Sequence, residues 1–106
     1  MTRLCHLNDI IEGGCKEFTV DGTLLFAVKH QNKVYLYHNR CPHMGIQLNW
    51  QPDQFLDMDK TLIQCSTHGA LFIIHSGECV AGPCRGQRLK PIFFELKEDV
   101  IYVNLS

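Results

Sequence analysis

The sequence lacks long apolar runs, an excess of charge of one sign and any sustained helical period. Its longest apolar runs, residues 24–28 and 70–74, hold five residues each, whereas a membrane-spanning helix needs about 20. The formal net charge of the 106 residues is −1, which is unlike the basic surface of a general nucleic-acid binder. We therefore expect no membrane or nucleic-acid partner. No segment keeps a 3.6-residue apolar repeat for three turns, so no long helix is expected.

Signals of secretion and of a disulfide framework are also missing. Residues 1–14 contain neither the apolar core nor the cleavage site of a secretory signal, so a reducing, cytoplasmic location is the expectation. Six cysteines in 106 residues fall below the density of a disulfide scaffold. In a cytosolic chain, cysteines at motif spacing point to metal or redox chemistry instead.

Short stretches rich in β-branched and aromatic residues follow one another along the chain, separated by turn signals. Asp21-Gly22 between two such stretches indicates a hairpin. The expected strands cover residues 15–20, 23–29, 34–38, 61–64, 71–74, 92–96 and 100–105. These features predict an all-β fold, a small antiparallel sandwich or barrel. The length predicts a single domain over residues 1–106.

A long polar loop, residues 39–60, interrupts this pattern, and long loops in compact domains are usually functional or disordered. It contains Cys-Pro-His at residues 41–43, and Cys-Ser-Thr-His follows at residues 65–68, after an expected strand. Gly45 and Gly69 come soon after the two histidines and allow a close backbone approach. Thiolates and imidazoles together suit zinc, iron or an iron–sulfur cluster and exclude magnesium and calcium.

The motifs CPHMG (residues 41–45) and CSTHGALF (65–72), followed by SGECVAGP (76–83), resemble the Rieske [2Fe–2S] domain. The resemblance implies one [2Fe–2S] cluster in a Rieske-like antiparallel fold. It also implies a cluster-binding part with two loops over about residues 39–84, and base strands over about residues 1–38 and 85–106.

The resemblance assigns the cluster ligands residue by residue. Cys41 and Cys65 would bind the inner iron, while His43 and His68 would bind the outer iron nearer the surface. The residues of the surrounding loops would be Gly45, Gly69, Gly82 and Pro83. Gly82-Pro83 matches the family's proline loop, which covers the cluster on a third side.

Two departures from other members of the family indicate which branch the chain resembles and what redox potential to expect. Their loop-bracing disulfide cannot form here, because Ile46 and either Ser66 or Thr67 stand at its positions. The chain therefore looks like the soluble ferredoxin branch. Ala70 and Phe72 stand where high-potential members have a serine and a tyrosine, so we predict a midpoint potential toward the low end of the Rieske range, roughly −150 to +300 mV.

The implied function is that of a one-electron carrier with no catalytic residues of its own. It would take electrons from a flavoprotein reductase and pass them to an oxygenase or another redox enzyme in transient complexes. Two alternatives stay open: a small accessory subunit of a larger reductase such as nitrite reductase, and an interaction module stabilised by zinc on the same four ligands.

Two further groups of residues have more than one interpretation. Cys79 and Cys84 are either a redox pair or cluster brace, or two small reduced thiols. Arg85, Arg88 and Lys90 form a basic group that either contacts an acidic partner or is simply a solvated face.

Overall fold

The computed structural model describes residues 1–40, 42, 48, 55–57, 59, 61–65, 69–82 and 86–105. Its elements are β1 (Thr2–His6), the short 3-10 helix η1 (Leu7–Asp9), β2 (Cys15–Val20), β3 (Thr23–His30), β4 (Lys33–His38), β5 (Leu62–Gln64), β6 (Leu71–Ile73), β7 (Cys79–Ala81), β8 (Phe93–Lys97) and β9 (Val100–Asn104). No helix among the described residues is long and apolar enough to cross a membrane.

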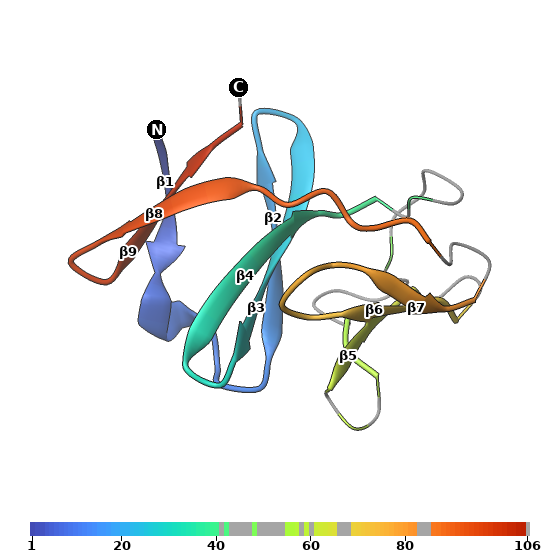
Figure 1. The fold of residues 1–106 in the computed structure, drawn as a ribbon. Coiled ribbons are helices and arrows are strands. Elements are labelled where there is room, and N and C mark those ends of the chain that lie inside the picture. Colours follow the sequence, from blue (N-terminus) through green and yellow to red (C-terminus); the bar gives the residue numbers. More distant parts are fainter. Residues whose placement is uncertain are drawn as a thin grey trace.

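Within the described residues, the strands form three antiparallel sheets of three strands each (Figure 1). The terminal sheet has the order β1-β9-β8, the central sheet β2-β3-β4 and the distal sheet β5-β6-β7. In Figure 1 the central sheet lies between the other two, and the chain leaves it after β4 for the distal sheet and returns through β8. The predicted antiparallel all-β fold is confirmed.

The central sheet is buried on both faces, which explains the unbroken apolar run in β3. Alternate side chains of a strand point to opposite faces. Phe26 and Val28 belong to the core shared with the distal sheet, whereas Leu25 and Ala27 belong to the core shared with the terminal sheet. A strand that is covered on both sides needs apolar residues at every position.

Two tight hairpins set the register of the central sheet. Asp21 and Gly22 both have positive φ angles and join Val20 to its partner Thr23, as the Asp-Gly signal predicts. The β3–β4 turn is held from outside the sheet, because the Glu12 carboxylate accepts the backbone N–H groups of residues 31 and 32 at 2.9 and 2.8 Å.

The expected strands agree with those of the structure to within one residue at each end. Two strands of the structure, β1 and β7, are not among the expected strands. Each of these strands is paired by a partner that the local pattern does not indicate: β1 pairs with β9 from the other end of the chain, and β7 is a three-residue edge strand on β6.

Candidate metal centre

The second motif begins directly after β5, and its two ends are joined by backbone hydrogen bonds. Cys65 is fully buried, its N–H donates to the Ala70 carbonyl at 2.8 Å, and its own carbonyl accepts the Gly69 N–H at 2.9 Å. Gly69 has a φ of 68°, in the left-handed region that glycine adopts without a steric penalty. These hydrogen bonds fix the backbone of Cys65, one of the two predicted thiolate ligands.

The glycine of the predicted proline loop lies against the end of the second motif. Gly82 has a φ of 98°, and a Cβ built there would lie 2.8 Å from the Ala70 Cα atom and 3.1 Å from its Cβ atom. A contact that short is not tolerated, so this position requires glycine. Gly82 follows β7, whose Ala81 pairs with Leu71. The distal sheet therefore brings the second motif and the start of the proline loop together.

The buried side chain of Asn39, which is not among the predicted site residues, joins the two sides of the segment that contains the first motif. Asn39 precedes Cys41 by two residues, and its Oδ1 atom accepts the Leu48 N–H at 2.8 Å. Its own N–H donates to the Leu24 carbonyl at 2.9 Å, which ties it to the central sheet. The signal for this role was available, because asparagine side chains often bond to nearby backbone.

The expectation of a polar loop over residues 39–60 is incomplete. Leu48 and Phe55 are fully buried, and the Phe55 ring stacks on Phe26 of β3 with a centroid distance of 4.2 Å and an interplanar angle of 4°. Phe55 also accepts the Gln64 N–H at 2.8 Å, so the segment beside it extends the distal sheet. Apolar anchors thus hold the connection between the two motifs to both sheets.

The side chains near Cys65 form an apolar core. Cys65 belongs to the same buried cluster as Phe26, Leu48, Ala70 and Phe72. Neither Ala70 nor Phe72 carries a side-chain hydrogen-bond donor. Burial and the lack of donors control the redox potential of a metal centre, so both features agree with the prediction of a low potential.

Three of the eight predicted site residues, Cys65, Gly69 and Gly82, lie in the part of the chain that the structure describes. The other five lie outside the described residues: Cys41, His43, Gly45, His68 and Pro83. Within the described residues, no three His, Cys, Asp or Glu side chains gather at one point, so the four-ligand set remains a prediction. Its donor chemistry, two thiolates and two imidazoles, fits a Rieske-type [2Fe–2S] cluster.

The structure supports one interpretation of Cys79. Its side chain is buried in β7, and its thiol lies 3.2 Å from the Ala81 carbonyl, to which it donates. A buried thiol that is hydrogen-bonded within its own strand matches the interpretation of a small, reduced core residue. Cys84, the other member of the predicted pair, lies outside the described residues, as does Arg85 of the basic group.

Comparisons with known proteins give one family and a consistent fold. The model of the Rieske [2Fe-2S] domain family matches residues 1–98. The cholesterol 7-desaturase of Caenorhabditis elegans is 30% identical over 81 residues, which are 76% of this chain and only 18% of the desaturase. The chain therefore spans less than a fifth of that enzyme.

Solved ferredoxin structures share the fold over nearly the whole chain. The ferredoxin of carbazole 1,9a-dioxygenase from Nocardioides aromaticivorans IC177 superposes with a TM-score of 0.75 at 23% identity, over 97% of both chains. A structure described as the complex of reduced oxygenase and oxidized ferredoxin in carbazole 1,9a-dioxygenase gives a TM-score of 0.76 at 24% identity, over 95% of this chain and 89% of the other. At these identities the likeness establishes the fold.

Proposed function

Because the chain belongs to the Rieske [2Fe-2S] domain family, we propose that it is a Rieske-type ferredoxin that carries one electron at a time between redox proteins. Domains of this family bind one [2Fe–2S] cluster with two cysteine and two histidine ligands. The cofactor predicted from the two motifs is thereby confirmed at the level of the family, and the zinc alternative loses its support.

The proposed ligands are those that the motifs predict: Cys41 and Cys65 for the inner iron, and His43 and His68 for the outer iron. The loop residues Gly45, Gly69, Gly82 and Pro83 would surround them. Support comes from the buried position of Cys65 and from the contact of Gly82 with Ala70. When bound, the cluster accepts and releases a single electron.

The proposed division of the domain follows from the same ligands. Residues of about 39–84 form the cluster-binding part, and residues of about 1–38 and 85–106 form the base, within one domain over residues 1–106. The order of the sheets supports this division, because the distal sheet is built from residues 62–81 and the other two sheets from the remaining strands.

The observation that carries the carrier function is the extent of the match to a ferredoxin, 97% of both chains. Such a protein needs only a cluster close to its surface and partners that bind briefly, because weak, small interfaces suit electron transfer. We propose a flavoprotein reductase as the electron donor and an oxygenase or another redox enzyme as the acceptor, in a reducing cytoplasmic environment. The fold shared with the ferredoxin of an oxygenase complex supports the oxygenase.

A second candidate function is that of an electron-transfer component bound stably to a larger enzyme, as in an accessory subunit of a reductase. The likeness to part of the cholesterol 7-desaturase favours it, because that likeness connects this domain to a much longer enzyme. Purification of the protein from its native cells separates the two functions. A stable large complex indicates a subunit, whereas a small separate species indicates a carrier.

The visible spectrum of the purified protein, with iron and acid-labile sulfide assays, tests the proposed function. We expect a coloured protein with about two irons and two sulfides per chain, which dithionite bleaches and a flavoprotein reductase with NADH reduces. Cys65→Ser should abolish the colour, while Cys79→Ser, a matched change at another buried cysteine, should keep it. A colourless protein with one zinc would contradict the proposal.

A further inference from the structure

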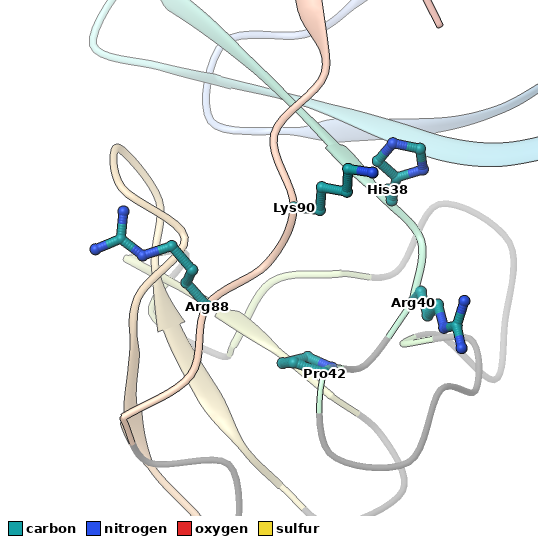
Figure 2. Close-up of a pocket in the computed structure, with 5 residues that line it drawn as sticks. All are labelled: His38, Arg40, Pro42, Arg88 and Lys90. Carbon is teal, nitrogen blue, oxygen red and sulfur yellow. The ribbon is translucent and has the colours of Figure 1, made fainter. Parts of the chain in front are cut away.

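A hollow of about 250 Å³ lies beside the first motif and is lined mostly by basic side chains (Figure 2). Its lining residues are His38, Arg40, Pro42, Arg88 and Lys90. Pro42 is the residue between the proposed ligands Cys41 and His43. The hollow therefore adjoins the loop through which an electron would enter or leave.

The fold holds the two walls of this hollow together. His38 ends β4, and its N–H donates to the Lys90 carbonyl at 2.9 Å. On that neighbouring segment Leu89 is fully buried, while Arg88 and Lys90 on either side of it are exposed. In an extended segment, residues on either side of a buried one point to the opposite face. Arg88 and Lys90 thus both lie on the exposed side of this segment, and in Figure 2 the Lys90 side chain extends toward His38 while the Arg88 side chain extends away from it.

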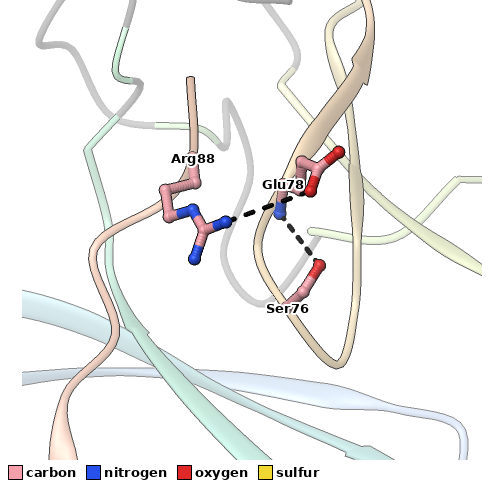
Figure 3. Close-up of polar contacts among 3 residues, drawn as sticks. All are labelled: Ser76, Glu78 and Arg88. Carbon is pink, nitrogen blue, oxygen red and sulfur yellow. Dashed lines mark hydrogen bonds and ion pairs between the residues drawn. The ribbon is translucent and has the colours of Figure 1, made fainter. Parts of the chain in front are cut away.

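The positive charge of this surface is poorly compensated. The Arg88 guanidinium lies 4.0 Å from the Glu78 carboxylate, and the backbone N–H of Glu78 donates to the Ser76 hydroxyl (Figure 3). An exposed pair at that distance contributes little. Among the residues that the structure describes, no carboxylate lies within ion-pair distance of Arg40 or Lys90.

His38 adds a polar group without adding charge. Burial and, to a lesser extent, the Lys90 ammonium hold the pKa of His38 below its ordinary value, so its imidazole is neutral at neutral pH. Among the described residues, three cations therefore line the hollow in a chain whose formal net charge is −1. Charge that is segregated in this way orients an approaching protein.

We infer that the surface formed by Arg40, Arg88 and Lys90 beside Pro42 docks a carboxylate-rich surface of a redox partner. The inference rests on the proposed function and specifies the chemistry of the partner. Acidic groups around the partner's own redox centre would be drawn to the side of this protein where the first motif lies. Complementary charge of this kind mainly speeds association and selects the partner.

Other occupants fit this surface less well. A small-anion site needs buried donors, but Arg40, Arg88 and Lys90 are all exposed. A nucleic acid would need contacts to many phosphates along its backbone, whereas the hollow offers three cations in a chain of net negative charge.

Charge reversal at matched positions tests the inference. The docking variant is Arg88→Glu with Lys90→Glu, and the control is Arg3→Glu with Lys33→Glu, on exposed residues of β1 and at the opposite end of β4 from His38. Each pair replaces two cations by two anions and changes the formal net charge from −1 to −5. The neutral pair Arg88→Gln with Lys90→Gln serves if the reversed pair folds poorly.

The first readout is electron transfer from the dithionite-reduced protein to two oxidants of opposite charge, hexacyanoferrate(III) and hexaamminecobalt(III). Each oxidant takes one electron from the protein. At low salt, the ratio of the anionic to the cationic rate should fall about tenfold in the docking variant. In the control it should change by less than about twofold, and salt near 0.5 M should remove the difference. Equal changes in the two variants would overturn the inference.

The second readout is independent of redox chemistry. Poly-L-glutamate added to the isotope-labelled protein should shift the backbone amide signals of residues 38–40 and 88–90, and these shifts should disappear in the docking variant only. Shifts spread evenly over the protein, or equal shifts produced by the same concentration of inorganic phosphate, would overturn the inference. A protein that exchanges no electrons but binds poly-L-glutamate at this surface would contradict the proposed function alone.

Discussion

The central sheet has long, well-paired strands, whereas the distal sheet has short strands and depends on contacts with its neighbour for stability. The central sheet has strands of six, eight and six residues, and each of its two strand pairings contains six residue pairs. The distal sheet has three strands of three residues each. Strands this short are at the lower limit of what proteins use. Yet the distal sheet carries the second motif and Gly82.

The distal sheet gains its rigidity from contacts with the central sheet. The Tyr37 hydroxyl of β4 donates to the Ile74 carbonyl at 2.6 Å, and the Tyr37 ring packs so closely on Gly77 that a Cβ there would lie 2.8 Å from it. The stack of Phe55 on Phe26 is a further link. A few side chains, mainly from the central sheet, thus hold a distal sheet whose own strands are short.

Removing the aromatic stack should have the largest effect on this arrangement. Phe55→Ala deletes a fully buried ring, and such a change typically destabilises a protein by about 4 kcal/mol. Urea unfolding measures the loss. Hydrogen exchange should also quicken in β5 and β6 more than in β3, because the distal sheet loses its support first.

Phe93→Ala is the matched control for that experiment, since Phe93 is 63% exposed. Its effect should be below about 1 kcal/mol. If Phe55→Ala accelerated exchange equally in all three sheets, the distal sheet would not be the dependent one.

Gly82→Ala tests the contact between the proline loop and the second motif. The new Cβ would strain a backbone with a φ of 98° and collide with Ala70, for a combined loss of about 3 kcal/mol. We also expect less iron per chain. Gly86→Ala is the control, because Gly86 has a similar φ of 92° but nothing within 4 Å of its Cβ position. Iron content and thermal unfolding of the pair separate the collision from the backbone strain, and equal losses would exclude the collision.

Tyr37→Phe should weaken the link between the sheets by about 2 kcal/mol, because it leaves the buried Ile74 carbonyl without its donor. Burial is the main cause that raises the pKa of Tyr37 from 10.0 to about 12. The neutral phenol is therefore favoured in the folded state, and this stabilisation is complete below pH 10 and lost as the pH rises toward 12. The stability difference between wild type and variant should shrink over that interval. Urea unfolding of both proteins at neutral pH and between pH 10 and 12 measures the difference, and a constant difference would contradict this prediction.

The sequence predicts the central sheet well because its signals are local. The Asp21-Gly22 turn and the apolar run of β3 are visible in the sequence, and they indicate a hairpin and a strand buried on both faces. β1 is different, because it is a strand only by virtue of pairing with β9, with Thr2 opposite Val103. Pairing between the two ends of a chain leaves little trace in local composition.

The candidate site shows the same contrast between local and long-range information. The two Cys–His motifs, at residues 41–43 and 65–68, resemble the Rieske domain together with the segment 76–83, and the family model over residues 1–98 agrees with that resemblance. Asn39 and Phe55 support the site through contacts with residues distant in the sequence: Asn39 accepts a hydrogen bond from Leu48, and Phe55 stacks on Phe26. Phe55 and Leu56 form a short apolar pair in a mostly polar segment, so no periodic pattern identifies Phe55 as a core residue.

The smallest predicted effect concerns the redox potential, which depends on the buried residues near the second motif and not on the stability of either sheet. Ala70→Ser introduces a hydroxyl donor at a fully buried position next to Gly69. A hydrogen bond to a cluster sulfur stabilises the additional negative charge of the reduced form, and a gain of about 1 kcal/mol corresponds to a rise of roughly 40 mV in the midpoint potential of a one-electron couple. Ala81→Ser, on the paired strand β7, should leave the potential unchanged within about 10 mV. Protein-film voltammetry measures the midpoint potentials of the two variants. A rise in both, or in neither, would mean that the donors absent at residues 70 and 72 do not set the low potential that we predict.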